Sequence, residues 1–128
     1  MRFLLDTHAL LWWWTDDPKL PDSARSLILD EGNTILVSAA SAWEISTKHR
    51  LGRLAIGAEV IARFRELLDA DGFQHLPISY LHALHAGGLA SEHRDPFDRI
   101  LAAQSRLESA PLISRDDMFA TLGVARRW

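Results

Sequence analysis

The chain has 128 residues, of which 48% are hydrophobic and 24% charged, and this fits one soluble domain with its own core. Its net charge of −3 gives no overall attraction for nucleic acid, and the lack of cysteine excludes disulfides and thiolate zinc sites. No apolar run is long enough to cross a membrane, and Asp6 interrupts the N-terminal apolar stretch that a signal peptide needs. We therefore expect one domain over 1–128, located in the cytoplasm and without a membrane partner.

Short apolar runs alternate with segments of helical periodicity along the whole chain. In chain order we predict a strand at 2–5, helices at about 7–14 and 22–31, a strand at 34–38, helices at 39–54 and 57–72, a strand at 73–79, helices at 79–89 and 95–109, and strands at 110–114 and 123–128. The helix at 22–31 is expected to begin with Asp22 or Ser23 as its N-cap, and the helix at 95–109 with Asp95.

The predicted strands are continuous apolar runs rather than alternating patterns. Strands of this kind, separated by helices, indicate a parallel sheet covered on both faces, which is an α/β fold with three α/β/α layers. In such sheets, ligands bind beyond the carboxyl ends of the strands, at the point where the strand order reverses.

Acidic residues follow several of these strands. Asp6 comes directly after the first strand, and Glu44 lies in the helix that follows Ser38 at the end of the second. Ser114 ends a later strand and precedes Asp116 and Asp117, while the preceding helix begins with Asp95 and Asp98. Acids from separate segments are therefore expected to converge at one end of the sheet.

Each acid also has a structural explanation when it is taken alone. Asp6, Asp95 and Asp116 suit helix N-caps, and Asp98 lies in a first helical turn, where the helix dipole favours negative charge. Glu44 completes a capping box with Ser41 and can pair with Lys48 one turn later. Capping explains the acids singly, but it does not explain why all of them lie at the same end of the sheet.

Four segments together resemble the PIN-domain ribonuclease toxins, with the VapC component of type II toxin–antitoxin pairs as the most similar group. They are LLDTHALLW (4–12), VSAASAWEISTKHRLGRL (37–54), HRDPFDRILAAQS (93–105) and PLISRDDMF (111–119). The resemblance covers nearly the whole chain. It implies a Mg²⁺- or Mn²⁺-dependent endoribonuclease with a PIN-like three-layer fold, inhibited by a cognate antitoxin and forming a homodimer.

The resemblance also implies which residues form the site. The acids of the family match Asp6, Glu44, Asp98 and Asp116, with Asp95 and Asp117 as alternatives for the last two, and Thr7 and Ser114 match small hydroxyl residues lining the same pocket. Clustered carboxylates repel one another unless a cation lies between them, and hard divalent cations prefer oxygen ligands. We expect Asp6 and Asp98 to bind the metal directly, and Glu44 and Asp116 to bind a second metal or its waters.

Basic and aromatic residues near these acids suggest contacts with partners. His93, Arg94 and Arg99 flank the third acidic segment and are candidates for contacts with RNA phosphates. Successive helical residues point about 100° apart, so Trp12, Trp13 and Trp14 cannot all face one core. We therefore expect at least one of the three to be exposed or buried by another chain, at a homodimer or antitoxin contact.

Other classes of function fit the sequence less well. A receiver-type signalling module needs a lysine after the last core strand, where this chain has Arg115, and a dehalogenase-type phosphatase needs a second aspartate where this chain has His8. His82 and His85 have a spacing that zinc can use, although an ordinary helix face explains it as well. A non-catalytic PIN-fold protein-binding module remains the main alternative, and loss of one or more acids would indicate it.

Overall fold

The structure is a computed structural model that describes residues 1–55 and 57–128. Within these residues, five parallel strands form one sheet in the order β3-β2-β1-β4-β5. The strands are β1 (Arg2–Leu5), β2 (Thr34–Ser38), β3 (Gln74–Leu76), β4 (Leu112–Ile113) and β5 (Arg126–Arg127). The central strands β1 and β2 are almost fully buried, as their continuous apolar sequences predict.

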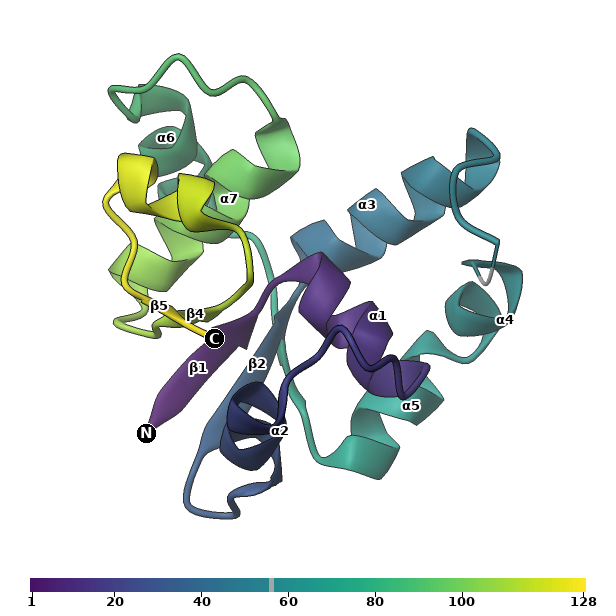
Figure 1. Ribbon diagram of the computed structural model, residues 1–128. Helices are drawn as coiled ribbons and strands as arrows, with labels where there is room; N and C mark the ends of the chain where they lie inside the picture. Colours follow the sequence, from purple (N-terminus) through teal and green to yellow (C-terminus); the bar gives the residue numbers. More distant parts are fainter. Residues whose placement is uncertain (56) are drawn as a thin grey trace.

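Helices cover both faces of this sheet (Figure 1). One face contacts α1 (Thr7–Trp14), α2 (Asp22–Leu29), α4 (Gly57–Ala62) and α5 (Phe64–Asp71). The other contacts α7 (Pro96–Leu107), which packs on α6 (Tyr80–Gly88), and the 3-10 helix η1 (Asp117–Leu122). Alternate strand residues enter the two cores, with Phe3 and Leu5 in one and Leu4 in the other. The predicted three-layer α/β/α sandwich is confirmed.

The strand order reverses beside β1, because β2 and β3 extend the sheet on one side and β4 and β5 on the other. Leu5 is the register partner of Ile113, so Asp6 and Ser114 leave the sheet next to each other. α3 (Ala39–Arg50) starts at the same end, directly after β2 (Figure 1). The fold thus brings the ends of β1, β2 and β4 to the place where open parallel sheets bind ligands.

Several local predictions differ from the structure. The periodic segment at 57–72 forms two helices, α4 and α5, which meet at Arg63, where no glycine or proline in the sequence marks a break. The N-cap of α2 is Pro21 without a side-chain hydrogen bond, so neither Asp22 nor Ser23 caps that helix. Helix α3 ends at Arg50, because the chain turns at Leu51 and Gly52 adopts a φ of 73° that favours glycine.

The tryptophan run of α1 is packed within the chain. The indole N–H groups of Trp13 and Trp14 both donate to Oδ2 of Asp71, at 3.1 and 2.8 Å. Trp13 packs on Phe73, and Trp14 lies edge-on to Phe64. All three tryptophans are half-buried against the same core, so none is fully exposed. The contact with another chain at their remaining surface stays a prediction. Among the described residues, no helix is both long and apolar enough to cross a bilayer.

Candidate active site

Asp6 is a buried carboxylate at the point where the strand order reverses, with 7% of its surface exposed. Its Oδ1 accepts the backbone N–H of His8 at 2.9 Å, which makes it the N-cap of α1. Its Oδ2 accepts the hydroxyl of Ser114, and that hydroxyl in turn accepts the backbone N–H of Asp116. The predicted capping role is therefore present, and these hydrogen bonds also fix the carboxylate in position.

Glu44 lies in α3 and is 3% exposed. Lys48, one helical turn later, donates from Nζ to Glu44 Oε2 at 2.5 Å, which is the ion pair that the spacing predicts. The predicted capping box with Ser41 is wrong, because Ser38 caps α3 by accepting the N–H of Ala40. A buried glutamate in the middle of a helix has no capping role.

Thr7 and Ser41 are joined by a buried hydrogen bond between their hydroxyl groups, at 2.9 Å. This bond links the first turn of α1 to the first turn of α3. It holds the helices that carry Asp6 and Glu44 at a fixed relative position. Thr7 is buried and does not line the hollow beside Asp6, so its role as a residue of the pocket stays a prediction.

The two aspartates at the start of α7 have different environments. Asp95 is the N-cap and accepts the N–H groups of Phe97 and Asp98, at 2.9 and 3.5 Å. The Asp98 side chain is 22% exposed and contacts His93 Nε2 at 2.9 Å. Burial raises the pKa of Asp98 to about 6, the hydrogen bond from His93 opposes this shift, and the charges of Asp95, Glu44 and Asp6 add to it. The protonation of Asp98 is thus coupled to the charges of these three acids.

The fourth acidic position lies at an open rim. Asp116 caps η1 by accepting the N–H of Met118 at 3.0 Å, as its sequence position predicts. Asp116 and Asp117 are both exposed, and both line the same hollow of about 360 Å³ as Asp6. The hydrogen bond from the Asp116 N–H to Ser114 connects this rim to the Asp6 carboxylate.

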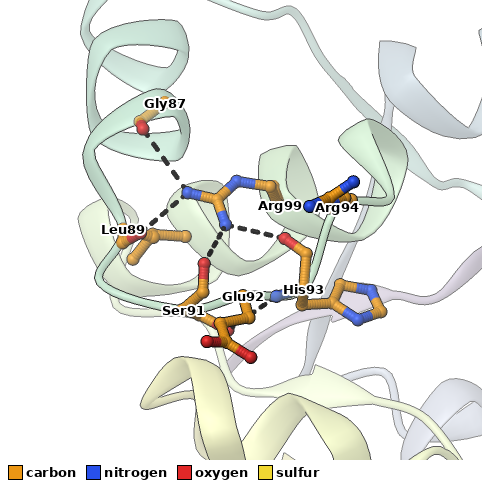
Figure 2. A pocket seen from close by; sticks show the side chains of 7 residues that line it. All are labelled: Gly87, Leu89, Ser91, Glu92, His93, Arg94 and Arg99. Atoms are coloured by element: carbon orange, nitrogen blue, oxygen red, sulfur yellow. Dashed lines mark hydrogen bonds between the residues drawn. The ribbon is translucent and has the colours of Figure 1, made fainter.

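A second hollow lies between the end of α6 and the start of α7 (Figure 2). Arg99 lies at its centre, and its guanidinium group donates only to backbone carbonyl groups. The acceptors are Ala86, Gly87, Leu89, Ser91 and His93, at 2.8 to 3.4 Å. Arg99 therefore holds the loop that carries His93 against α7, and the exposed Arg94 is the freer cation at this hollow.

Sequence reasoning did not assign His8, Trp12 or Arg115 to the site, although all three line the hollow beside Asp6. His8 Nδ1 lies 3.7 Å from Asp6 Oδ1, and this contact raises the pKa of the imidazole. Its position two residues after Asp6 in the sequence could have indicated that His8 lies near the site. Arg115 follows β4, which is the neighbour of β1 in the sheet. Its place beside Asp6 therefore depends on the strand order, which the sequence alone does not give.

The donor set can be tested for a divalent cation. Within residues 1–55 and 57–128, no three acidic or histidine side chains already lie close enough together to form a complete metal site. Mg²⁺ needs only one or two carboxylates and takes its other ligands from water and phosphate. Asp6 and Asp98 supply such oxygens. The pKa of Asp98 is raised first by burial and then by the charges of Asp95, Glu44 and Asp6, and a cation would relieve this smaller repulsive part. The residues fit a hard divalent ion.

A model of the PIN domain family matches residues 3–125. Ribonuclease VapC16 of Mycobacterium tuberculosis is 33% identical over 64 residues, and this match spans 50% of the chain and 45% of that relative.

Several solved structures have a similar fold. VapBC2 of Rickettsia felis, bound to a DNA fragment from its promoter, has a TM-score of 0.72 at 18% identity and covers 99% of this chain and 98% of its own. VapBC-1 of nontypeable Haemophilus influenzae has a TM-score of 0.70 at 20% identity, with 99% and 97% covered. FitAcB of Neisseria gonorrhoeae has a TM-score of 0.68 at 22% identity, and the match covers 98% of this chain and 96% of that one. At these identities the similarity concerns the fold.

Proposed function

Because the PIN domain model matches residues 3–125, the chain belongs to the PIN domain family, and we propose that it is a VapC-type endoribonuclease that depends on a divalent cation. The observation that supports this proposal is that Asp6 and Glu44 are buried near the carboxyl ends of β1 and β2, and that their charges act on the partly buried Asp98. The similarity to a relative named as a ribonuclease supports RNA as the substrate.

We assign roles to the acids from their burial and hydrogen bonds. Asp6 and Asp98 would hold Mg²⁺ or Mn²⁺ directly, while Glu44 and Asp116 would hold a second ion or ordered water. A bound divalent ion supplies an activated water and stabilises negative charge on the leaving oxygen. Ser114 orients the Asp6 carboxylate, and Lys48 compensates the buried charge of Glu44.

Three other side chains are assigned supporting roles at this site. His93 orients Asp98 through the contact between its Nε2 and the carboxylate. Thr7 positions the start of α1 through its bond to Ser41. Arg94 is exposed at the second hollow, and we propose that it contacts an RNA phosphate.

Brief expression in a bacterial host, followed by sequencing of the RNA 5′ ends, tests the activity against all cellular RNAs at once. New ends at defined positions are expected with the natural chain and not with Asp98→Asn. The purified protein should then cut the identified RNA with Mn²⁺ or Mg²⁺ and stop when EDTA is added. Cleavage that persists in EDTA would contradict the metal mechanism.

We also propose a cognate antitoxin and a homodimer as partners. The solved structures of similar fold include VapBC and FitAcB proteins, and one of them is described as a toxin–antitoxin complex from Klebsiella pneumoniae. Helix α6 offers apolar surface for such a partner, because Tyr80, Leu81 and Leu84 are 74%, 56% and 69% exposed. Light scattering of the chain alone should give a dimer mass, and Leu84→Glu should shift it toward the monomer if α6 forms that contact.

A further inference from the structure

The hollow beside Asp6 is lined by two chemically different groups of residues. Asp6, Asp116 and Asp117 are acidic, whereas Trp12 and Arg115 contribute an aromatic ring and a cation. Its volume of about 360 Å³ falls in the range of sites for small ligands. The acidic group alone repels the phosphates of RNA, so the other group has to supply attraction if RNA enters here.

Trp12 differs from the two tryptophans that follow it. Trp13 and Trp14 turn toward α5 and share Asp71 as the acceptor for their indole N–H groups. Trp12 turns toward the hollow, where its ring lies 5.8 Å from the rings of His8 and Trp128, centroid to centroid. Across the part of the chain that the structure describes, its indole N–H has no hydrogen-bond acceptor. A half-buried ring with a free donor is suited to contact a ligand.

Arg115 lies over this ring, with its guanidinium carbon 4.9 Å from the Trp12 centroid. Although Asp116 and Asp117 follow it in the chain, Arg115 forms no ion pair with any described carboxylate. Its backbone is held on both sides, by Ser114 bonded to Asp6 and by Asp116 at the cap of η1. The backbone that carries this exposed and unneutralised cation is therefore fixed beside the acids.

We propose that Trp12 and Arg115 form a nucleotide subsite that binds the residue adjacent to the cleaved phosphate. Arg115 pairs with the neighbouring phosphate, and Trp12 stacks on the unpaired base. The inference rests on the proposed ribonuclease function and adds the residues that place the RNA. Arginine is suited to phosphate, and an aromatic ring stacks on any base whose face is free.

The present contact between Arg115 and Trp12 does not prevent this arrangement. A cation–π contact at an exposed site is weaker than the stacking of a base on an aromatic side chain. Arg115 is exposed, so it can turn from the ring to a phosphate while a base takes its place. The positive charge of Arg115 then offsets the negative charges of the acidic residues that line the same hollow.

Steady-state cleavage of the RNA identified by end mapping tests the subsite. Trp12→Leu should raise KM about 5- to 100-fold with little change in kcat, whereas Trp12→Phe, which keeps an aromatic face, should restore most of the loss. Arg115→Gln should raise KM and reduce the salt dependence of binding by about 0.7 in the log–log slope, as expected for one lost phosphate contact. The matched controls Trp14→Phe and Arg65→Gln change the same residue types on the α5 side and should leave KM unchanged.

Abasic substitution in the RNA separates stacking from a purely structural role. Removing the base next to the cut should weaken the natural protein, and the same removal should have little further effect on Trp12→Leu. If all RNAs and variants behave alike while the natural protein cleaves, the subsite is wrong and the proposed function stands. If the natural protein cleaves no RNA, both fall together. Arg115→Gln alters an exposed position and keeps the test decisive even if Trp12→Leu fails to fold.

Discussion

Two aspartates at the start of α7 are three residues apart in sequence and differ in what their side chains contact. Asp95 turns back on the helix backbone, whereas Asp98 meets His93 and is influenced by Glu44 and Asp6. Asparagine caps a helix about as well as aspartate but is a poor ligand for a hard cation. We therefore expect Asp98→Asn to reduce RNA cleavage more than about 100-fold and Asp95→Asn to leave it within about twofold.

Thermal unfolding provides the control for this pair. Asp95→Ala should cost about 1 kcal/mol through loss of the cap, while Asp95→Asn should cost much less. Loss of cleavage in Asp95→Asn with retention in Asp98→Asn would reverse the assignment of the third acid. If neither substitution matters, the start of α7 is structural and the metal site lies elsewhere.

The titration of Asp98 predicts a pH-dependent stability of the metal-free protein. Its pKa rises from 3.8 to about 6 in the folded chain, first because of burial. The folded state therefore holds this proton more tightly than the unfolded state does. The contribution of Asp98 to the free energy of unfolding is highest below pH 4 and falls as the pH rises toward 6. The difference between the two pKa values corresponds to about 3 kcal/mol.

Asp98→Asn removes this titration and isolates the effect. In urea unfolding with EDTA, the variant should gain stability relative to the natural chain by up to about 3 kcal/mol between pH 4 and pH 7. Comparing the two proteins at each pH cancels the titration of the other groups. A difference that stays constant over this range would show that the Asp98 carboxyl titrates as it does in the unfolded chain.

At the scale of elements, a buried polar contact joins β2, α6 and α7. Gln104 of α7 is fully buried and accepts the Ser38 hydroxyl at 2.5 Å. Its amide nitrogen lies 3.2 Å from the carbonyl of Pro77 and 3.3 Å from His82 Nδ1. His82 Nδ1 also accepts the N–H of Ser79 at the cap of α6. Gln104 therefore connects the cap of α3 to the start of α6.

Gln104→Leu keeps a similar size but leaves buried polar atoms without partners. Its expected cost is about 1–3 kcal/mol in chemical unfolding. Gln74→Leu is the matched control, since Gln74 is exposed in β3, and its effect should stay within about 0.5 kcal/mol. Equal effects at both positions would mean that the hydrogen bonds of Gln104 contribute nothing beyond its size.

The same elements show where sequence reasoning succeeds and where it stops. The strands β1 and β2 are predictable because their apolar runs can only be buried on both faces. Ser38 caps α3 because the helix begins at Ala39, so Ser41 lies inside the first turn. The hydroxyl of Ser41 instead bonds to Thr7 from a distant part of the chain, which local sequence cannot show. Likewise, Asp71, which accepts the indole N–H groups of Trp13 and Trp14, lies in α5. Local periodicity therefore cannot show that these two donors have a hydrogen-bond acceptor.

For the whole molecule, the position of the site follows from the strand order. Reversal beside β1 places Asp6 next to Ser114 although 108 positions separate them in the chain. That residues following different strands lie at one edge of the sheet was predictable, because parallel strands share one carboxyl end. The nearness of Arg115 to Trp12 was not, because it depends on which strand neighbours β1.

A cation that binds between acids from β1, α3 and α7 should stabilise the entire fold. At a hundredfold excess of Mn²⁺ over its Kd, the gain is about 2.7 kcal/mol, or about 10 °C in Tm for a chain of this size. The rise should be smaller at pH 5 than at pH 8, because protons compete for Asp98, whose pKa is about 6. Scanning calorimetry should show that Asp6→Asn and Asp98→Asn blunt the rise, while Asp69→Asn, an exposed acid of α5, preserves it. An equal rise in all four proteins would place the ion away from the strand reversal.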